Sequence, residues 1–144
     1  EWEPYQRRIE ELGIADAVKT FLEYIPSGDV YRYFEAADMV ILPYHHFDSQ
    51  SGIGATAVSF RKPMIVSDVG GLPDLVKNRK YAVPPKDAAA LARSMIECLQ
   101  DQSRLAAMAA DAETVAAEIS RSSIAQKTCA IYDDLLRTKK KPTR

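Results

Sequence analysis

The sequence predicts an α/β fold in which helices cover a parallel sheet. Residues 39–42 (MVIL) and 63–66 (PMIV) are short, continuous apolar runs, which are typical of strands buried on both faces. Helical patterns lie between and after these runs, and strands that alternate with helices indicate parallel pairing through right-handed connections. The length of 144 residues suits one domain of ordinary size.

Before the first apolar run, the pattern predicts two helices and one strand. A helix over residues 5–12 has Pro4 near its first turn and Gly13 as its stop signal. Residues 17–24 predict a short strand, because apolar side chains recur in it. A second helix is expected over residues 30–37, with Ser27 or Asp29 as its N-cap.

After the apolar run at residues 39–42, a polar and aromatic loop is expected over residues 44–50 and a tightly packed helix over 51–60. After the second run, at 63–66, we expect a turn over 68–71, a short helix over 72–76 and a third strand over 81–83. From residue 87 onward the chain is expected to be helical. Three apolar stripes at helical spacing are expected to face the core. The stripes are Leu91, Met95, Ile96 and Leu99; Leu105, Met108, Ala109, Ala112 and Val115; and Ile124, Thr128, Ile131, Tyr132 and Leu135.

Composition and charge exclude several classes of protein. The net charge of −1 does not indicate an electrostatic nucleic-acid binder. The basic residues 137–141 with Arg144 predict a solvated tail, although contact with a membrane surface stays open. Cys98 and Cys129 match no metal spacing, so we expect buried free thiols and a reducing cytoplasm. No apolar run has the length of a membrane span, and the first residues resemble neither a signal peptide nor a natural start, which suggests a piece of a longer chain.

The loop before the helix at residue 51 is the strongest candidate for a ligand site. In parallel α/β sheets, ligands bind at the carboxyl ends of strands, near a helix N-terminus. The first turn of a helix has N–H groups without internal partners, which favour an anion. Gly52 and Gly54 permit close approach, and Ser49 and Ser51 add hydroxyl donors. The alternative is that Ser51 only caps the helix and the glycines only allow packing.

Three stretches, in this order, resemble the retaining GT-B glycosyltransferases of group 1, the family 4-like glycogen synthase and sucrose synthase superfamily. They are residues 33–43 (YFEAADMVILP), 62–76 (KPMIVSDVGGLPDLV, similar to "GKPVVASDVGGLPEVV") and 83–92 (VPPKDAAALA, similar to "VPPGDPEALA"). The resemblance implies a Rossmann-like sheet, the C-terminal nucleotide-sugar-binding domain of a GT-B enzyme. The first strands of that sheet, with a basic "GR…KG" region, would precede this chain, and we expect an exposed sheet edge in their absence.

The resemblance also implies a division of the chain and a set of partners. Residues 1–120 would be the truncated nucleotide-sugar-binding domain, 121–138 a helix that returns toward an N-terminal Rossmann-like domain, and 139–144 a basic tail. Partners would be a nucleotide sugar, an acceptor glycan or lipid, and that N-terminal domain, with no nucleic acid. The expected location is cytoplasmic, with peripheral contact at the inner face of the membrane left open.

The family's E-x7-E motif is altered here, because its two positions fall on Asp48 and Thr56. The resemblance gives Asp48 a contact with the transferred sugar, and it puts the ribose grip at Thr56 in doubt. The letters QSG at residues 50–52 resemble a sub-branch of the family, which indicates a variant donor loop. The resemblance implies donor contacts at Ser49, Gln50, Ser51 and Gly52, and base contacts at Tyr24 and Ile25.

The remaining features of the loops predict structure rather than chemistry. The turn over residues 68–71 is expected to be mainly structural, because paired glycines usually serve backbone conformation. His45 and His46 have no further ligand at a metal spacing, so we expect no metal site. No cofactor is expected apart from the donor substrate.

These observations predict the donor-binding part of a glycosyltransferase that acts with retention, in polysaccharide biosynthesis or a related pathway. The isolated chain is expected to be inactive, because basic groups for the departing diphosphate would lie elsewhere. Two alternatives remain at this point. One is a non-catalytic nucleotide-binding or interaction module, and the other is a sugar-nucleotide epimerase on the same fold.

Overall fold

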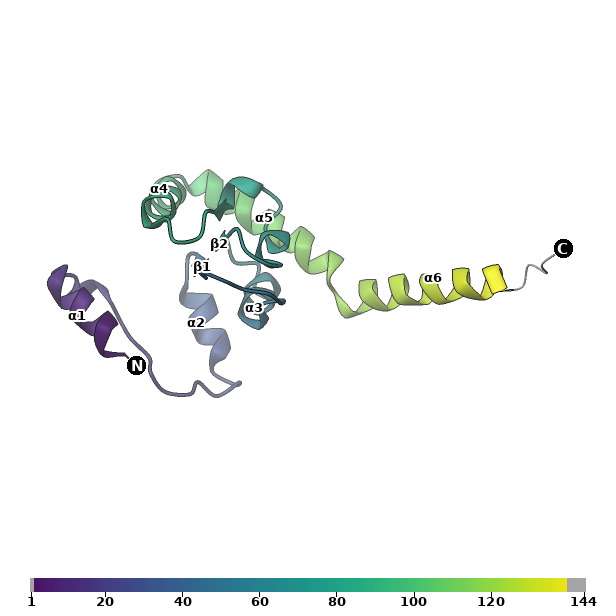
Figure 1. Cartoon of the computed structure of the whole chain (residues 1–144), viewed down its shortest axis with the longest axis horizontal. Helices are drawn as coiled ribbons and strands as arrows, with labels where there is room; N and C mark the ends of the chain where they lie inside the picture. Colours follow the sequence, from purple (N-terminus) through teal and green to yellow (C-terminus); the bar gives the residue numbers. More distant parts are fainter. Residues whose placement is uncertain (1, 140–144) are drawn as a thin grey trace. The chain divides into compact units, whose positions relative to one another are not determined.

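The computed structural model describes residues 2–139, and the chain divides into two compact units, Glu1–Val30 and Tyr31–Arg144. Figure 1 shows the chain, with labels on its α-helices and on β1 and β2. The elements are α1 (Glu3–Glu11), η1 (Ala15–Ala17), α2 (Val30–Ala36), β1 (Val40–Leu42), α3 (Gly52–Ser59), β2 (Met64–Ser67), η2 (Leu72–Leu75), η3 (Arg79–Tyr81), β3 (Ala82–Val83), α4 (Ala88–Leu99), α5 (Gln102–Glu118) and α6 (Arg121–Lys139), where η denotes a 3-10 helix.

The second unit contains a parallel sheet in the order β1-β2-β3, which confirms the predicted α/β class. The register aligns Ile41 with Ile65 and Val66 with Ala82. All four residues of β2 are buried, as its apolar sequence predicts for a central strand covered on both faces. Within the described residues β1 pairs with β2 alone, so its other edge is unpaired.

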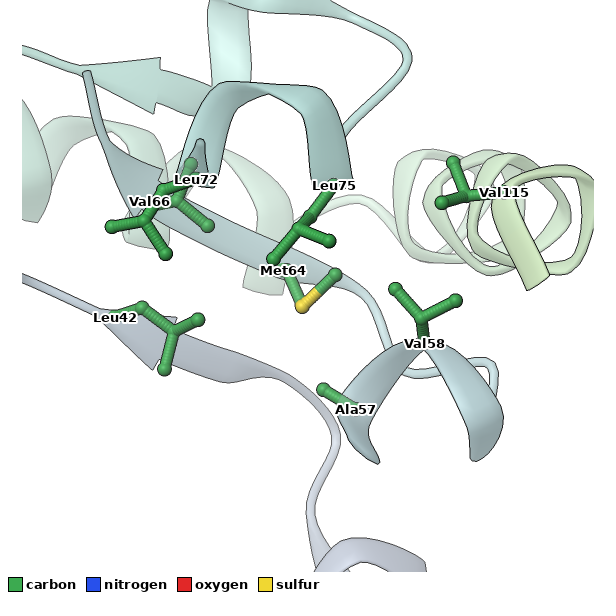
Figure 2. Close-up of a cluster of buried hydrophobic side chains, with 8 residues drawn as sticks. All are labelled: Leu42, Ala57, Val58, Met64, Val66, Leu72, Leu75 and Val115. Atoms are coloured by element: carbon green, nitrogen blue, oxygen red, sulfur yellow. The ribbon is translucent and has the colours of Figure 1, made fainter. Parts of the chain in front are cut away.

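Alternate residues of the strands build two separate cores. One face gathers side chains from β1, β2, α3, η2 and the C-terminal half of α5, and Figure 2 shows them pointing toward one another. They are Leu42, Ala57, Val58, Met64, Val66, Leu72, Leu75 and Val115. The opposite face packs Ile65 and Val83 against Cys98 of α4 and Met108 of α5. This period of two along β2, with Ile65 on one face and its neighbours on the other, produces three layers.

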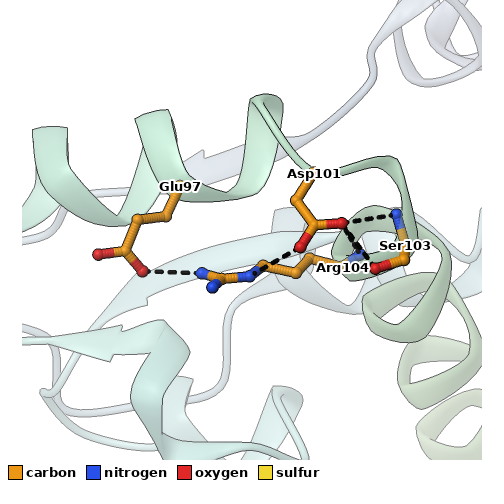
Figure 3. A network of polar contacts seen from close by, with 4 residues as sticks. All are labelled: Glu97, Asp101, Ser103 and Arg104. Atoms are coloured by element: carbon orange, nitrogen blue, oxygen red, sulfur yellow. Dashed lines mark hydrogen bonds and ion pairs between the residues drawn. The ribbon is translucent and has the colours of Figure 1, made fainter.

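A polar network at the turn between α4 and α5 fixes the start of α5. The Asp101 carboxylate caps the helix, because it accepts hydrogen bonds from the backbone N–H groups of Ser103 and Arg104. Arg104 contacts Glu97 at 2.8 Å and Asp101 at 3.2 Å (Figure 3). The hydrogen bond from the Ser103 hydroxyl is the largest cause that holds the pKa of Asp101 below its usual value. These groups are solvent-exposed to a large extent, so the network orients the turn more than it stabilises the fold.

Some predictions of local structure are wrong. The strand expected over residues 17–24 is absent. Ala17 ends the 3-10 helix η1, and no described strand pairs with residues 18–24, where an isolated strand would lack ladder hydrogen bonds. The short helix expected over 72–76, by contrast, is present as the 3-10 helix η2. Cys98 is buried, and this burial raises the pKa of its thiol, whereas Cys129 is exposed. The stripe on α6 is also exposed, with Ile131 at 60% and Leu135 at 52%, so it is no core face of this chain.

Two further features concern the ends of the chain and the membrane. The predicted boundary at residue 120 falls between α5 and α6, and the division proposed there stays a prediction. Most of the basic tail lies outside the described residues. Across residues 2–139, no helix combines the length and the apolar character that crossing a bilayer requires.

Candidate functional site

The parallel sheet brings two loops to one edge. Because β1 and β2 are parallel and in register, both end at the same side of the sheet. The first loop, residues 43–51, follows β1 and enters α3, and the second, residues 68–71, follows β2 and enters η2. The sequence placed the candidate ligand loop at a strand's carboxyl end, and the structure confirms this position.

The first turn of α3 has two open amides. Ser51 is the N-cap, with φ −81° and ψ 116°, and its buried hydroxyl accepts a hydrogen bond of 3.0 Å from the N–H of Gly54. The next N–H, of Ala55, binds the Ser51 carbonyl at 2.9 Å. Among the residues that the structure describes, the N–H groups of Gly52 and Ile53 have no acceptor. Ser51 is therefore a cap, and the helix still presents two free donors beside it.

The two glycines of this turn have different roles. A Cβ on Gly54 would overlap the Leu75 side chain and lie 3.3 Å from that of Leu42, so Gly54 lets α3 pack against the core. A Cβ on Gly52 would meet nothing within 4 Å. The packing alternative therefore accounts for Gly54 only, and Gly52 leaves open space next to the free amides.

The turn after β2 contacts the candidate loop, residues 43–51, from the other side. Gly70 has a φ of +52°, and a Cβ there would overlap the carbonyl oxygen of Phe47. A Cβ on Gly71 would overlap the side-chain amide of Gln50. The Phe47 ring lies 5.0 Å from the ring of Tyr44, which braces the loop internally. The turn is structural, as expected, but the structure it supports is the candidate loop, and sequence reasoning missed that contact.

Asp48 has a partner within the loop. Its Oδ2 lies 2.9 Å from Nε2 of His46, and both side chains are 81% exposed. The contact is an ion pair only when His46 is protonated, and high exposure makes it a small stabilising term. Asp48 therefore stays accessible for a ligand, and its role toward a sugar stays a prediction.

The other predicted site residues are placed less directly for binding. The Thr56 hydroxyl donates a hydrogen bond of 2.8 Å to the carbonyl oxygen of Gly52, so the side chain is turned back along its own helix. Ser49 is an exposed loop residue. Tyr24, 85% exposed, and the half-buried Ile25 belong to the first unit, in a segment without regular structure. Their base contact stays a prediction.

No metal centre emerges from the arrangement of side chains. Within residues 2–139, His, Cys, Asp and Glu form no group of three or more that could hold an ion. The expectation of a metal-free site is not tested by this observation and stays a prediction.

Two features beside the loops were not predicted from the sequence. Ser67, the last residue of β2, is only 3% exposed, and Lys86 has a left-handed backbone with φ +63°. The proline pair before Lys86 signals a turn, and the similar pattern "VPPGDPEALA" has glycine at the position of Lys86, which is the signal for a positive φ there.

The fold and the loops define a class of protein: an α/β domain with a parallel sheet and an open helix tip at the edge where such domains bind ligands. Comparison with known proteins identifies the family. Residues 1–115 match the family model described as "Glycosyl transferases group 1". The chain therefore belongs to the group 1 glycosyltransferases, and its fold is that of GT-B enzymes.

Individual relatives agree with this assignment. The chain is 32% identical over 129 residues to a D-inositol 3-phosphate glycosyltransferase of Thermobispora bispora, covering 88% of this chain and 29% of that protein. It superposes on sucrose-phosphate synthase from Thermosynechococcus elongatus with a TM-score of 0.75 and 25% identity, over 94% of this chain and 34% of that one. Anabaena HepE, solved in complex with UDP, gives a TM-score of 0.78 at 21% identity over 92% and 36%. The chain thus spans about a third of the length of these relatives.

Proposed function

We propose that this chain is the donor-binding part of a glycosyltransferase that moves a sugar from a nucleotide-diphosphate sugar to a glycan, lipid or small molecule, with retention of configuration. The observation behind the proposal is the pair of open amides at Gly52 and Ile53, next to a glycine whose Cβ direction is empty. Membership in the group 1 glycosyltransferases supports the assignment of the guest as a nucleotide sugar.

The helix tip suits the leaving group of such a reaction. When the bond between sugar and diphosphate breaks, negative charge grows on the diphosphate oxygen. Free N–H groups and the positive end of the α3 dipole stabilise this charge. Ser51 fixes the first turn before any ligand binds, so the amides need no reorganisation when the charge develops.

The rest of the donor would lie along the variant loop. Ser49 and Gln50 offer a hydroxyl and an amide to the diphosphate, and Asp48 faces solvent where it can reach sugar hydroxyls. Base contacts are assigned to Tyr24 and Ile25. HepE has been solved with UDP and with UDP and glucose, which makes UDP the first nucleotide to test here. The proposal includes a cytoplasmic location, but no metal ion and no prosthetic group.

A proline substitution tests the amides directly. Gly52→Pro removes the N–H at the first position of α3 and adds a ring in the open space beside it. Proline is well tolerated at this position of a helix, and the extended backbone of Ser51 suits a following proline. Calorimetry should detect UDP binding by the unmodified chain and a loss of about tenfold or more in Gly52→Pro, since a donor to a charged group contributes roughly 1.5–3 kcal/mol.

A matched control separates loss of the site from loss of the fold. Gln102→Pro places proline at the first position of α5, where Asp101 is the extended N-cap. Its affinity for UDP should equal that of the unmodified chain. Equal affinity in Gly52→Pro would contradict the proposal, as would the absence of heat with UDP, GDP and ADP alike.

The chain by itself is proposed to bind the donor without turning it over. Two amides and a helix dipole provide only part of the positive charge that the leaving diphosphate needs, and the acceptor would bind on an N-terminal domain. Assays of donor hydrolysis and of transfer to simple acceptors should show no turnover by this chain. Measurable turnover would contradict this part of the proposal and leave the donor site intact.

One observation favours a second function, a non-catalytic module of the same family. Thr56, at the position expected to grip a ribose, uses its hydroxyl on the Gly52 carbonyl instead. A module that has lost nucleotide binding would give no heat of binding with UDP, GDP or ADP. The Gly52→Pro variant would then behave like the unmodified chain in every binding assay.

A further inference from the structure

A small hollow lies at the edge of the sheet where all three strands end. It has a volume of about 150 Å³. Its walls are Pro43 and His45 after β1, Ser67 at the end of β2, and Pro84 and Lys86 after β3, and the first turn of α4 closes it. Residues 49–53 do not line it, so the hollow is distinct from the tip of α3.

The Ser67 hydroxyl opens into this hollow without a partner. Ser67 is 3% exposed, and its side chain makes no hydrogen bond within residues 2–139. Every fully enclosed side-chain oxygen or nitrogen within residues 2–139, however, has a hydrogen-bond partner. The two observations agree when the Ser67 oxygen faces the hollow, where a guest or water can reach it. The Ser67 oxygen is thus open to the hollow and has no protein partner, so it is free to bind a guest there.

Lys86 stands at the rim of the same hollow in a costly conformation. Its φ of +63° lies in the left-handed region, which a glycine would occupy without strain. Its ammonium group has no ion pair or hydrogen bond among the described residues. The carboxylate of Asp87, which also lines the hollow, accepts a hydrogen bond of 2.8 Å from the N–H of Ala90. Strain at a side chain that does nothing else for the fold is typical of ligand clamps.

We propose that this hollow binds the phosphate group of a small ligand, with Lys86 as the charge partner and Ser67 as a hydroxyl donor. The His45 ring, at the rim and exposed, adds a further N–H donor. The volume is well below that of a pocket for a whole drug-sized molecule, so it suits a single group rather than a nucleotide. Lysine binds phosphate as a point charge, and a hydroxyl adds direction. The site stands on this geometry and does not depend on the donor site proposed above.

Titration of the 144-residue chain with inorganic phosphate tests the site. Backbone amide NMR signals of Ser67, Lys86 and Ala88 should shift and saturate, whereas sodium chloride at equal ionic strength should leave them unchanged. Shifts that never saturate, or that chloride reproduces, would refute the proposal, because they would report screening of charge and not a bound anion.

Two left-handed residues provide a matched pair of variants. Lys86→Gly removes the cation and relieves the backbone, so phosphate affinity should fall by roughly tenfold while the thermal midpoint stays equal or rises. Arg61→Gly relieves the same strain at φ +53°, outside the hollow, and removes only an exposed ion pair with Glu113. Its phosphate affinity should be unchanged. Equal phosphate affinity in Lys86→Gly and Arg61→Gly would overturn the assignment.

The hydroxyl and the source of the phosphate are tested separately. Ser67→Ala loses no hydrogen bond within the described chain, so the fold should survive while phosphate affinity falls several-fold. UDP and a hexose 6-phosphate then distinguish two sources. Competition by UDP would assign the hollow to the donor diphosphate, whereas competition by the hexose phosphate, unaffected by Gly52→Pro, would assign it to a phosphorylated second substrate. Failure of both to displace inorganic phosphate would contradict the proposal.

Discussion

At the scale of single residues, paired glycines have separate effects that the sequence does not distinguish. Gly70 needs its positive φ and lies against backbone of the candidate loop at Phe47, so a side chain there would strain two segments. Gly71 has φ −88°, which any residue adopts, and only the side chain of Gln50 fills the place of its missing Cβ. A side chain added at Gly71 would therefore displace the side chain of Gln50 without disturbing the backbone.

Gly71→Ala should displace the Gln50 amide and lower UDP affinity several-fold, while stability changes by no more than about 1 kcal/mol. The reason is steric: the new methyl group takes the place that the amide occupies, and a flexible side chain moves more easily than backbone. Calorimetry measures the affinity, and the NMR signal of the Gln50 side-chain amide should shift in the variant.

A double-mutant cycle checks that the effect passes through Gln50. If the amide is the only group displaced, Gly71→Ala combined with Gln50→Ala should bind UDP as Gln50→Ala alone does, because one residue cannot lose its contact twice. Strictly additive losses would show that Gly71 acts on the loop by another route, and Gln50 would then not be the group through which Gly71 affects binding.

At the scale of elements, the sequence correctly predicted the helices and strands in which the local hydrophobic pattern agrees with the burial in the fold. The run at β2 and the small residues of α3 fit a central strand and a closely packed helix, and both appear where expected. Prediction failed where an element depends on a partner outside its own segment. Residues 18–24 have a strand-like composition but no neighbouring strand among the described residues, and the apolar stripe of α6 has the right spacing but stays exposed.

The candidate site shows the same division. Ser51 as an N-cap followed from its position before a helix, and the structure confirms it. The open amides of Gly52 and Ile53, the contact between Gly71 and Gln50, and the left-handed Lys86 depend on how separate loops meet at the sheet edge. Backbone dihedrals and contacts between loops are set by tertiary packing, which periodicity in one segment does not encode.

At the scale of the whole molecule, the two units differ in how their backbone is protected. No residue of the first unit within positions 2–30 is buried, whereas the second unit encloses both cores. The helix α1 has nine residues, a length at which an isolated helix is marginal in water. Burial of apolar surface is what resists local opening, so the two units should open with very different free energies.

Hydrogen exchange on the 144-residue chain should reveal this difference residue by residue. Amides of α1 should exchange orders of magnitude faster than those of Ile65 and Val66, which lie in the central strand and are 0% and 1% exposed. The slowest amides should report the global free energy of unfolding of the second unit. Because α1 has no buried residue of its own, comparable protection in α1 and β2 would contradict this prediction and would mean that the first unit gains stability from a surface beyond its own residues.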